Sequence, residues 1–241
     1  MPLPEKFREH LDAQGYHPRS DKHSNSLAEC VVEDLLDICA AAREAAERGN
    51  LVYDLNFDLR FSNSTWNVDL VIGVPASPVP VRAGRIVRAT PASVRIAVEL
   101  KTVMTEHRKA VKNRKRDFEA HHEHVHNYDS RAVAGGVMVV NAAPRFQSPL
   151  VQHPTIHGNS KSTVADLVDH CVTEMRNVAT SGGASSFGMD AKSVIVVAVD
   201  NMGTPVSYLR VPPAPQPGDP LHYDSFLRRL CDDYSSRFGG R

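Results

Sequence analysis

The chain has 241 residues, enough for one large domain or two small ones. Its composition, 41% hydrophobic and 23% charged, is close to that of ordinary globular proteins, so we expect a normal buried core. The 28 basic and 28 acidic residues cancel, which excludes a global field that would hold a polyanion, and any affinity for nucleic acid must come from local clusters.

The first fifty residues predict a loose segment followed by a helix. Residues 1–25 are polar and contain several prolines, so we expect a loosely held arm. A short helix over residues 4–13 is compatible with this expectation. Ser26-x-x-Glu29 has the form of a capping box. Apolar residues then recur at spacings of three and four, which predicts a helix that runs to Gly49.

Three strands of the antiparallel type are predicted next. Apolar and polar residues alternate over residues 51–61, 66–73 and 94–101, and the composition between the first two is typical of a hairpin turn. Residues 74–92 contain four prolines and form a connection, with one short strand expected near residues 85–89.

The second half alternates helices with buried strands. Helical patterns cover residues 105–127, 164–179 and 223–238. Nearly continuous apolar runs at residues 133–141 and 194–199 are typical of strands covered on both faces. Residues 212–220 are a proline-rich crossing.

This order predicts one α/β domain with a mixed central sheet sandwiched by helices. The whole chain, residues 1–241, is expected to be a single domain. Its core is expected over about residues 26–200, and residues 212–241 are expected to add the crossing and a closing helix.

Three charged residues on neighbouring strands suggest chemistry. Glu99 and Lys101 are two apart and therefore share a strand face, and Asp69 lies on the polar face of the preceding strand. If the strands pair, two carboxylates and an ammonium converge. Two carboxylates can hold Mg²⁺, which activates water and neutralises a leaving oxygen in phosphodiester hydrolysis. The alternative is an ordinary exposed charge pair.

This pattern resembles the PD-(D/E)xK, or restriction-endonuclease-like, nuclease superfamily, although Val68 stands where the family has proline. The resemblance covers roughly residues 26–141. It implies a restriction-endonuclease-like core in which Asp69, Glu99 and the backbone carbonyl of Leu100 bind the metal while Lys101 assists the attacking water. A helical glutamate often joins this set, and Glu33 is the best match. The implied cofactor is Mg²⁺, with Mn²⁺ as a substitute.

A basic segment follows directly after Lys101. The residues expected to contact DNA are Arg108, Lys109, Lys112, Asn113, Arg114, Lys115 and Arg116. Lysine and arginine here would neutralise phosphates and give salt-dependent affinity. The expected function is a Mg²⁺-dependent DNA endonuclease of the restriction or phage-defence type. A non-catalytic nucleic-acid-binding module that keeps the nuclease fold is the alternative.

The run His121, His122, His124 and His126 invites a zinc hypothesis, because His122 and His126 have helical ligand spacing. The HExxH signature is absent, however, and we favour a solvated or DNA-facing helix end.

The remaining expectations concern partners and location. Double-stranded DNA is the expected substrate, and a homodimer would cut both of its strands. Arg82, Arg85, Arg88 and Asn113 are candidates for base contacts. No apolar run approaches the roughly 20 residues that span a bilayer, so we expect no membrane association. The four cysteines form no CxxC pair and are expected to be reduced core thiols in the cytoplasm.

Overall fold

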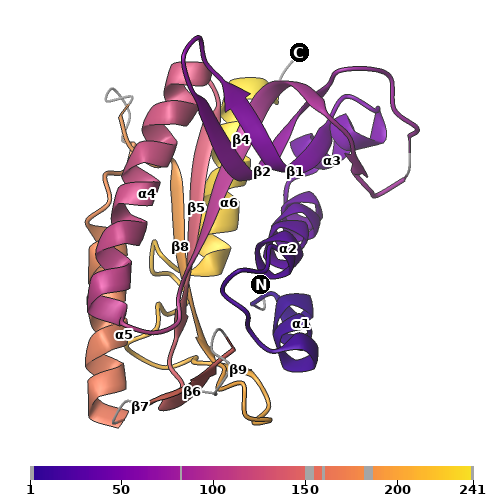
Figure 1. Ribbon diagram of the computed structural model, residues 1–241. Helices are drawn as coiled ribbons and strands as arrows, with labels where there is room; N and C mark the ends of the chain where they lie inside the picture. Colours follow the sequence, from indigo (N-terminus) through magenta and orange to yellow (C-terminus); the bar gives the residue numbers. More distant parts are fainter. Residues whose placement is uncertain (1–2, 82, 150–154, 159–160, 182–186, 240–241) are drawn as a thin grey trace.

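The computed structural model describes residues 3–81, 83–149, 155–158, 161–181 and 187–239, and it shows a seven-stranded sheet between two layers of helices (Figure 1). The helices are α1 (Glu5–Gln14), α2 (Lys22–Ile38), α3 (Ala40–Glu47), α4 (His107–Tyr128), α5 (Lys161–Arg176) and α6 (Tyr223–Phe238). The sheet contains β1 (Val52–Arg60), β2 (Thr65–Pro75), β3 (Val87–Arg88), β4 (Pro91–Val103), β5 (Val133–Asn141), β8 (Ala191–Ala198) and β9 (Ser207–Tyr208). A separate hairpin is formed by β6 (Arg145–Ser148) and β7 (Thr155–Gly158).

The sheet is mixed, as the sequence predicts. Its strand order is β3-β1-β2-β4-β5-β8-β9. The pairs β1/β2 and β2/β4 are antiparallel, whereas β4/β5 and β5/β8 are parallel. The predicted fold class, α/β with a mixed central sheet sandwiched by helices, is confirmed, and the short strand expected near residues 85–89 is β3.

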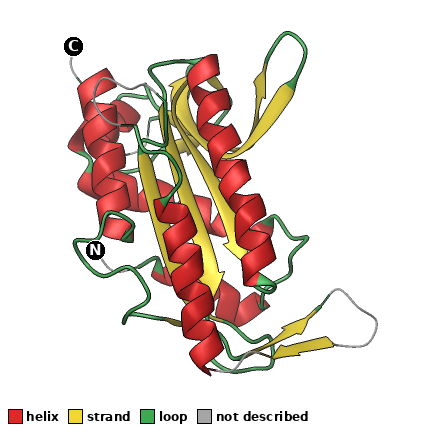
Figure 2. Cartoon of the chain, turned by 90° about the vertical axis from the view of Figure 1, so that its left-hand side faces the viewer, coloured by secondary structure: helices red, strands yellow, loops and turns green. Residues whose placement is uncertain are grey.

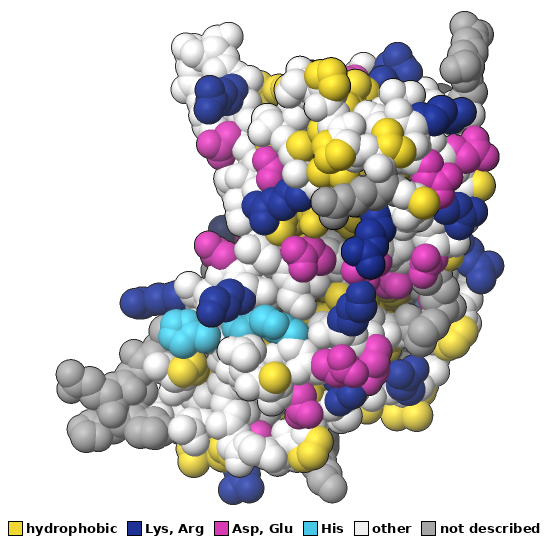
Figure 3. All heavy atoms as spheres, turned by 90° about the vertical axis from the view of Figure 1, so that its right-hand side faces the viewer, with side chains coloured by type: hydrophobic (Ala, Val, Ile, Leu, Met, Phe, Trp, Pro, Cys, Tyr) yellow, Lys and Arg dark blue, Asp and Glu magenta, His cyan; other side chains and the backbone are white. Residues whose placement is uncertain are grey.

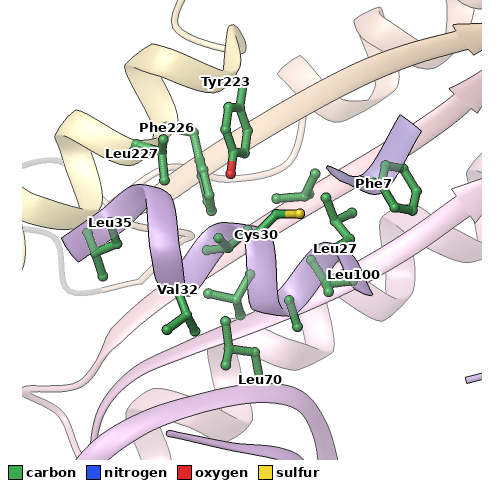
Figure 4. Packing of buried hydrophobic residues seen from close by; sticks show 14 of the residues in the cluster. Phe7, Leu27, Cys30, Val32, Leu35, Leu70, Leu100, Tyr223, Phe226 and Leu227 are labelled. Atoms are coloured by element: carbon green, nitrogen blue, oxygen red, sulfur yellow. The ribbon is translucent and has the colours of Figure 1, made fainter. Parts of the chain in front are cut away.

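Each face of the sheet has its own apolar layer. On one face α4 and α5 lie along β4, β5 and β8 (Figure 2). Helix α4 buries Val111, Phe118 and Val125, which recur every seven residues and so form one stripe. On the other face α2 and α6 pack together, and Figure 4 shows Leu70 and Leu100 of the sheet beneath α2. All nine residues of β5 are buried between the two layers.

Gly136 on β5 shows how closely α4 approaches the sheet. A Cβ atom built at this position would lie 2.5 Å from Met189 Cε and 2.9 Å from the Phe118 ring. A side chain at Gly136 would therefore force these neighbours apart, so the glycine allows α4 to pack closely on β5.

The N-terminal residues are packed against the core, so the expectation of a loosely held arm over residues 1–25 is wrong for the described part. In α1, Phe7 and Leu11 are buried four residues apart. The Tyr208 hydroxyl donates to the Pro4 carbonyl at 2.5 Å. Tyr16 Oη is hydrogen-bonded to Thr102 Oγ1 at 2.5 Å, which ties the segment to β4.

The helix expected to run from a Ser26 capping box to Gly49 differs at both ends. Helix α2 begins four residues earlier, at Lys22, so Ser26 lies inside it and caps nothing. It ends before Cys39, which leaves helical geometry (φ −105°, ψ 96°) and separates α2 from α3. The local propensity of the alanine-rich segment is helical, but one extended residue turns the chain.

Two of the four cysteines are paired, so the expectation of four reduced thiols is wrong. Cys39 and Cys231 form a disulfide that joins the α2–α3 junction to α6. Cys30 and Cys171 are free and buried. Among the described residues, no helix combines the length and apolar character needed to cross a bilayer.

Candidate active site

Asp69 lies where β2 and β4 stop pairing. Their ladder ends at Leu70 opposite Val98, whereas β4 continues to pair with β5 as far as Val103. Beyond this point the β1–β2 hairpin leaves the sheet and extends past the end of α4 (Figure 1). The Leu100 N–H, which has lost its strand partner, donates instead to Asp69 Oδ2 at 2.8 Å. The aspartate is therefore fixed by a backbone donor that the separation of the strands exposes.

Glu99 and Lys101 point to the same face as each other, opposite to Leu100. The Lys101 ammonium contacts Glu99 Oε1 and lies 3.4 Å from Asp69 Oδ2. The predicted convergence of the two carboxylates and the ammonium is thus present. The side chains of Asp69 and Lys101 are 17% and 22% exposed, whereas that of Glu99 is only 4% exposed. The cluster opens to solvent on the Asp69 side and is closed behind Glu99.

His121 of α4 closes the buried side of the cluster. Its Nδ1 atom lies 3.6 Å from Glu99 Oε2, and its Nε2 atom lies 3.3 Å from the Ala97 carbonyl oxygen. Since a carbonyl only accepts, Nε2 carries the proton and Nδ1 carries a lone pair. Burial lowers the pKa of His121 to about 3, so the ring is neutral.

The pKa values of Glu99 and Lys101 are shifted in a way that an exposed charge pair would not show. Burial, followed by the nearby negative charge of Asp69, raises the pKa of Glu99 to about 8 despite its contact with Lys101. Burial alone would lower the pKa of Lys101, but the charges of Glu99 and Asp69 outweigh it and the pKa is raised. Lys101 is therefore a charged ammonium that faces the carboxylate of Asp69 and the carboxyl group of Glu99.

The donor set fits a hard divalent cation. Glu99 Oε2 is buried and has no hydrogen-bond partner among the described residues. The N–H and carbonyl of one strand residue point to the same edge of the strand. Because the Leu100 N–H faces Asp69, the Leu100 carbonyl lies on the Asp69 edge of β4 too. Within the described part of the chain, no group of three or more His, Cys, Asp and Glu residues forms a ready-made metal site. Any ion here would keep several waters, as Mg²⁺ prefers.

Glu33 is not brought into this cluster, so its assignment to the active site is wrong. It lies on α2, which covers the opposite face of the sheet, and its carboxylate pairs with Lys6. It lines a groove of about 640 Å³ between α2 and the β3 region, together with Glu29, Tyr53 and Arg88. Helical periodicity carries no information about which face of the sheet the helix covers.

Two of the arginines considered for base contact belong to the same region. Arg85 and Arg88 line that groove, and Arg88 pairs with Asp54 at 3.2 Å. Arg82 lies outside the described residues. Figure 3 shows acidic and basic side chains intermixed on this side of the molecule, which gives the face no dominant sign of charge.

The residues of α4 expected to contact DNA divide into two groups. Arg108, Lys109, Lys112, Asn113 and Arg116 are exposed. Arg114 and Lys115 are engaged within the protein: Arg114 pairs with Asp117 at 3.0 Å and Lys115 pairs with Glu174 of α5 at 3.4 Å. Lys109 also pairs with Glu106, at 3.8 Å, so Arg108, Lys112 and Arg116 are the exposed cations best placed to meet phosphates. Lys115 ties α4 to α5, and Arg114 donates to the Thr102 carbonyl of β4.

The histidine run is not a solvated helix end, contrary to expectation. His121 and His122 are buried, His124 stacks on Trp66 with ring centroids 4.4 Å apart, and His126 lies 3.2 Å from Asp190. His121 was missed as a site residue. A signal existed, because Phe118, His121 and Val125 follow helical spacing along the buried stripe of α4.

Asp190 is a second charged centre that the sequence did not reveal. This buried carboxylate accepts hydrogen bonds from Arg237 at 2.6 Å and from the Ala134 N–H at 2.8 Å, and it also meets His126. Burial opposes its ionisation, but these donors outweigh burial and lower its pKa. The arrangement joins α6, β5 and α4, and we assign it a structural role.

Comparison with models of protein families, with curated proteins and with solved structures finds no match for this chain. The functional interpretation therefore depends on the geometry of the site.

Proposed function

We propose that this protein is a Mg²⁺-dependent DNA endonuclease of the restriction or phage-defence type, related in design to the PD-(D/E)xK nucleases. The observation that carries the proposal is the meeting of Asp69, Glu99 and Lys101 at the point where β2 and β4 separate. An exposed charge pair would have explained two of these residues. It does not explain why Glu99 is deeply buried with Oε2 left without a hydrogen-bond partner among the described residues, because such burial costs free energy.

Each residue has a role that follows from its surroundings. Asp69, held by the Leu100 N–H, presents its carboxylate at the solvent side of the cluster. Glu99 offers Oε2 from within, and the Leu100 carbonyl is the third oxygen donor. A bound Mg²⁺ ion, for which Mn²⁺ would substitute, supplies polarisation of the phosphate and a lowered pKa for its water. Lys101, partly exposed and charged, orients the attacking water or stabilises charge on the phosphoryl oxygens.

The exposed basic residues of α4 support DNA as the substrate. Arg108, Lys112 and Arg116 follow the cluster along the chain and stand on the outside of α4. Contacts of this kind position a duplex without reading its sequence. A nuclease with one site per chain cuts both strands as a dimer, so a homodimer remains part of the proposal. A cytoplasmic location is also part of the proposal.

The direct test is cleavage of supercoiled plasmid DNA with Mg²⁺, using EDTA and a Lys101→Met variant. We expect EDTA to abolish cleavage and Lys101→Met to reduce the rate by about 10²-fold or more. Lys22→Met, which removes an exposed lysine from α2, is the matched control and should cleave normally. Cleavage that survives EDTA or the Lys101 substitution would refute the mechanism.

One observation favours a non-catalytic DNA-binding module instead. Because the pKa of Glu99 is raised to about 8, Glu99 is mostly protonated near neutral pH, and the charge of Lys101 then balances that of Asp69 without a metal. In that case binding should weaken steeply with salt while no Mg²⁺-dependent product forms. The plasmid assay and a salt titration of DNA affinity distinguish the two functions.

A further inference from the structure

The buried side of the cluster contains two polar atoms without partners that face each other. Glu99 Oε2 and His121 Nδ1 are both buried, neither has a hydrogen-bond partner among the described residues, and they are 3.6 Å apart. When Glu99 is ionised, both atoms are lone-pair acceptors, and only a shared cation, either a proton or a metal ion, can satisfy both. Buried acceptors left in this state cost free energy, unless a cation lies between them.

The geometry points to His121 as a ligand of the metal ion at this site, through Nδ1, beside Glu99 and Asp69. This inference rests on the proposed function and specifies its metal. Donors about 2.1 Å from one ion lie roughly 3.0–3.4 Å apart at octahedral or tetrahedral angles. The observed 3.6 Å therefore needs only a small side-chain adjustment.

The opposite side of the imidazole ring supports the assignment. A histidine that binds a metal through one nitrogen usually donates its other N–H to a backbone carbonyl or a carboxylate, which fixes the tautomer. His121 Nε2 lies 3.3 Å from the Ala97 carbonyl of β4, which orients Nδ1 toward Glu99. His122, the next residue on the same helix, has an unpartnered Nδ1 too, but none of its contacts is with Asp69, Glu99 or Lys101 in the described part of the chain.

Lys101 explains why three ligands do not already surround a common point. Its ammonium contacts Glu99 and lies 3.4 Å from Asp69, so it occupies the space between the two carboxylates. A divalent ion held by Glu99 and Asp69 would take the place of this cation. Lys101, with 22% of its side chain exposed, would then be available to the phosphate on the solvent side.

A nitrogen ligand changes which metal the site prefers. Carboxylates and carbonyls suit Mg²⁺, whereas imidazole favours first-row transition ions. The site should therefore bind Mn²⁺ more tightly than Mg²⁺, by about tenfold or more, as expected for one nitrogen in an otherwise oxygen donor set.

The test is direct observation of Mn²⁺ bound to the whole protein, independent of DNA cleavage. Pulsed electron paramagnetic resonance of the wild-type protein with one equivalent of Mn²⁺ should show coupling to an imidazole ¹⁴N nucleus. His121→Asn should abolish that coupling and weaken Mn²⁺ binding by about 10- to 100-fold, measured by calorimetry. His122→Asn, a substitution of a buried neighbour, should leave both unchanged, and circular dichroism checks that each variant is folded.

The outcomes separate the two proposals. If Mn²⁺ binds the wild-type protein and Asp69→Asn abolishes binding, but no ¹⁴N coupling is seen, the His121 ligand is refuted while the two-carboxylate metal site stands. If the wild-type protein binds neither Mn²⁺ nor Mg²⁺ at millimolar concentration, both the ligand assignment and the metal-dependent nuclease are refuted. Coupling that persists in His121→Asn and disappears in His122→Asn would also overturn the assignment.

Discussion

Replacing Glu99 by glutamine should stabilise the metal-free protein at alkaline pH and change it little at acidic pH. Burial raises the pKa of Glu99 from 4.5 to about 8. The folded state therefore holds a proton that the unfolded state releases between these values, and the free energy of unfolding of the wild-type protein falls as pH rises through that window. Glutamine has no such proton and escapes the loss.

The size of the effect follows from the shift. With pKa values of 4.5 unfolded and about 8 folded, the wild-type protein loses about 1 kcal/mol of its free energy of unfolding at pH 5 and about 4–5 kcal/mol at pH 8.5. Glutamine also deprives Lys101 of one of its two carboxylates. We therefore expect the variant to gain about 2–4 kcal/mol relative to the wild-type protein at pH 8.5, and less than about 1 kcal/mol at pH 5.

Urea unfolding in EDTA, followed by circular dichroism at both pH values, measures this difference. Glu33→Gln is the matched control, because Glu33 is exposed and pairs with Lys6 at the surface. Its effect should stay within about 0.5 kcal/mol at either pH. A gain from Glu99→Gln that is equal at pH 5 and pH 8.5, or a loss at pH 8.5, would show that Glu99 is not a buried carboxylate with a raised pKa.

Three further predictions concern catalysis, DNA binding and stability. Lys101→Met should lose cleavage while retaining Mn²⁺ binding by calorimetry, since Lys101 competes with the metal instead of holding it; loss of metal binding would contradict this role. Replacing Arg108 and Lys112 together by alanine should lower the slope of log affinity against log salt by about 2, as measured by fluorescence anisotropy, and an unchanged slope would exclude them from the interface. Asp190→Ala should destabilise the protein by about 3–5 kcal/mol, because Arg237 is left without its buried partner; thermal unfolding checks this, and a loss below about 1 kcal/mol would refute it.

The parts of the fold that depend on local periodicity could be predicted from the sequence. Alternation placed Glu99 and Lys101 on one strand face, and the continuous apolar run of residues 133–141 predicted β5 at its observed bounds. The meeting of Asp69 with Glu99 also followed, because consecutive antiparallel strands are neighbours in most sheets.

The parts that depend on tertiary packing could not. The position of Glu33 is set by which face of the sheet α2 covers, and nothing near Glu33 in sequence specifies that face. The pairing of Cys39 with Cys231 spans 192 residues. The burial of His121 could be predicted, since it lies on the buried stripe of α4. Its contact with Glu99 could not, because that contact depends on how α4 packs against β4.

The layer of α2 and α6 has a consequence for how the protein is made. Residues from both ends of the sequence fill it: Phe7 and Leu35 come from the first two helices, and Phe226 and Leu230 come from α6. On the ribosome, the side of α2 that packs against α6 stays uncovered until residue 230 has emerged, whereas β4, α4 and β5 follow one another and can assemble during synthesis. Nascent chains stalled before α6 should therefore show α2 sensitive to proteases and available to chaperones.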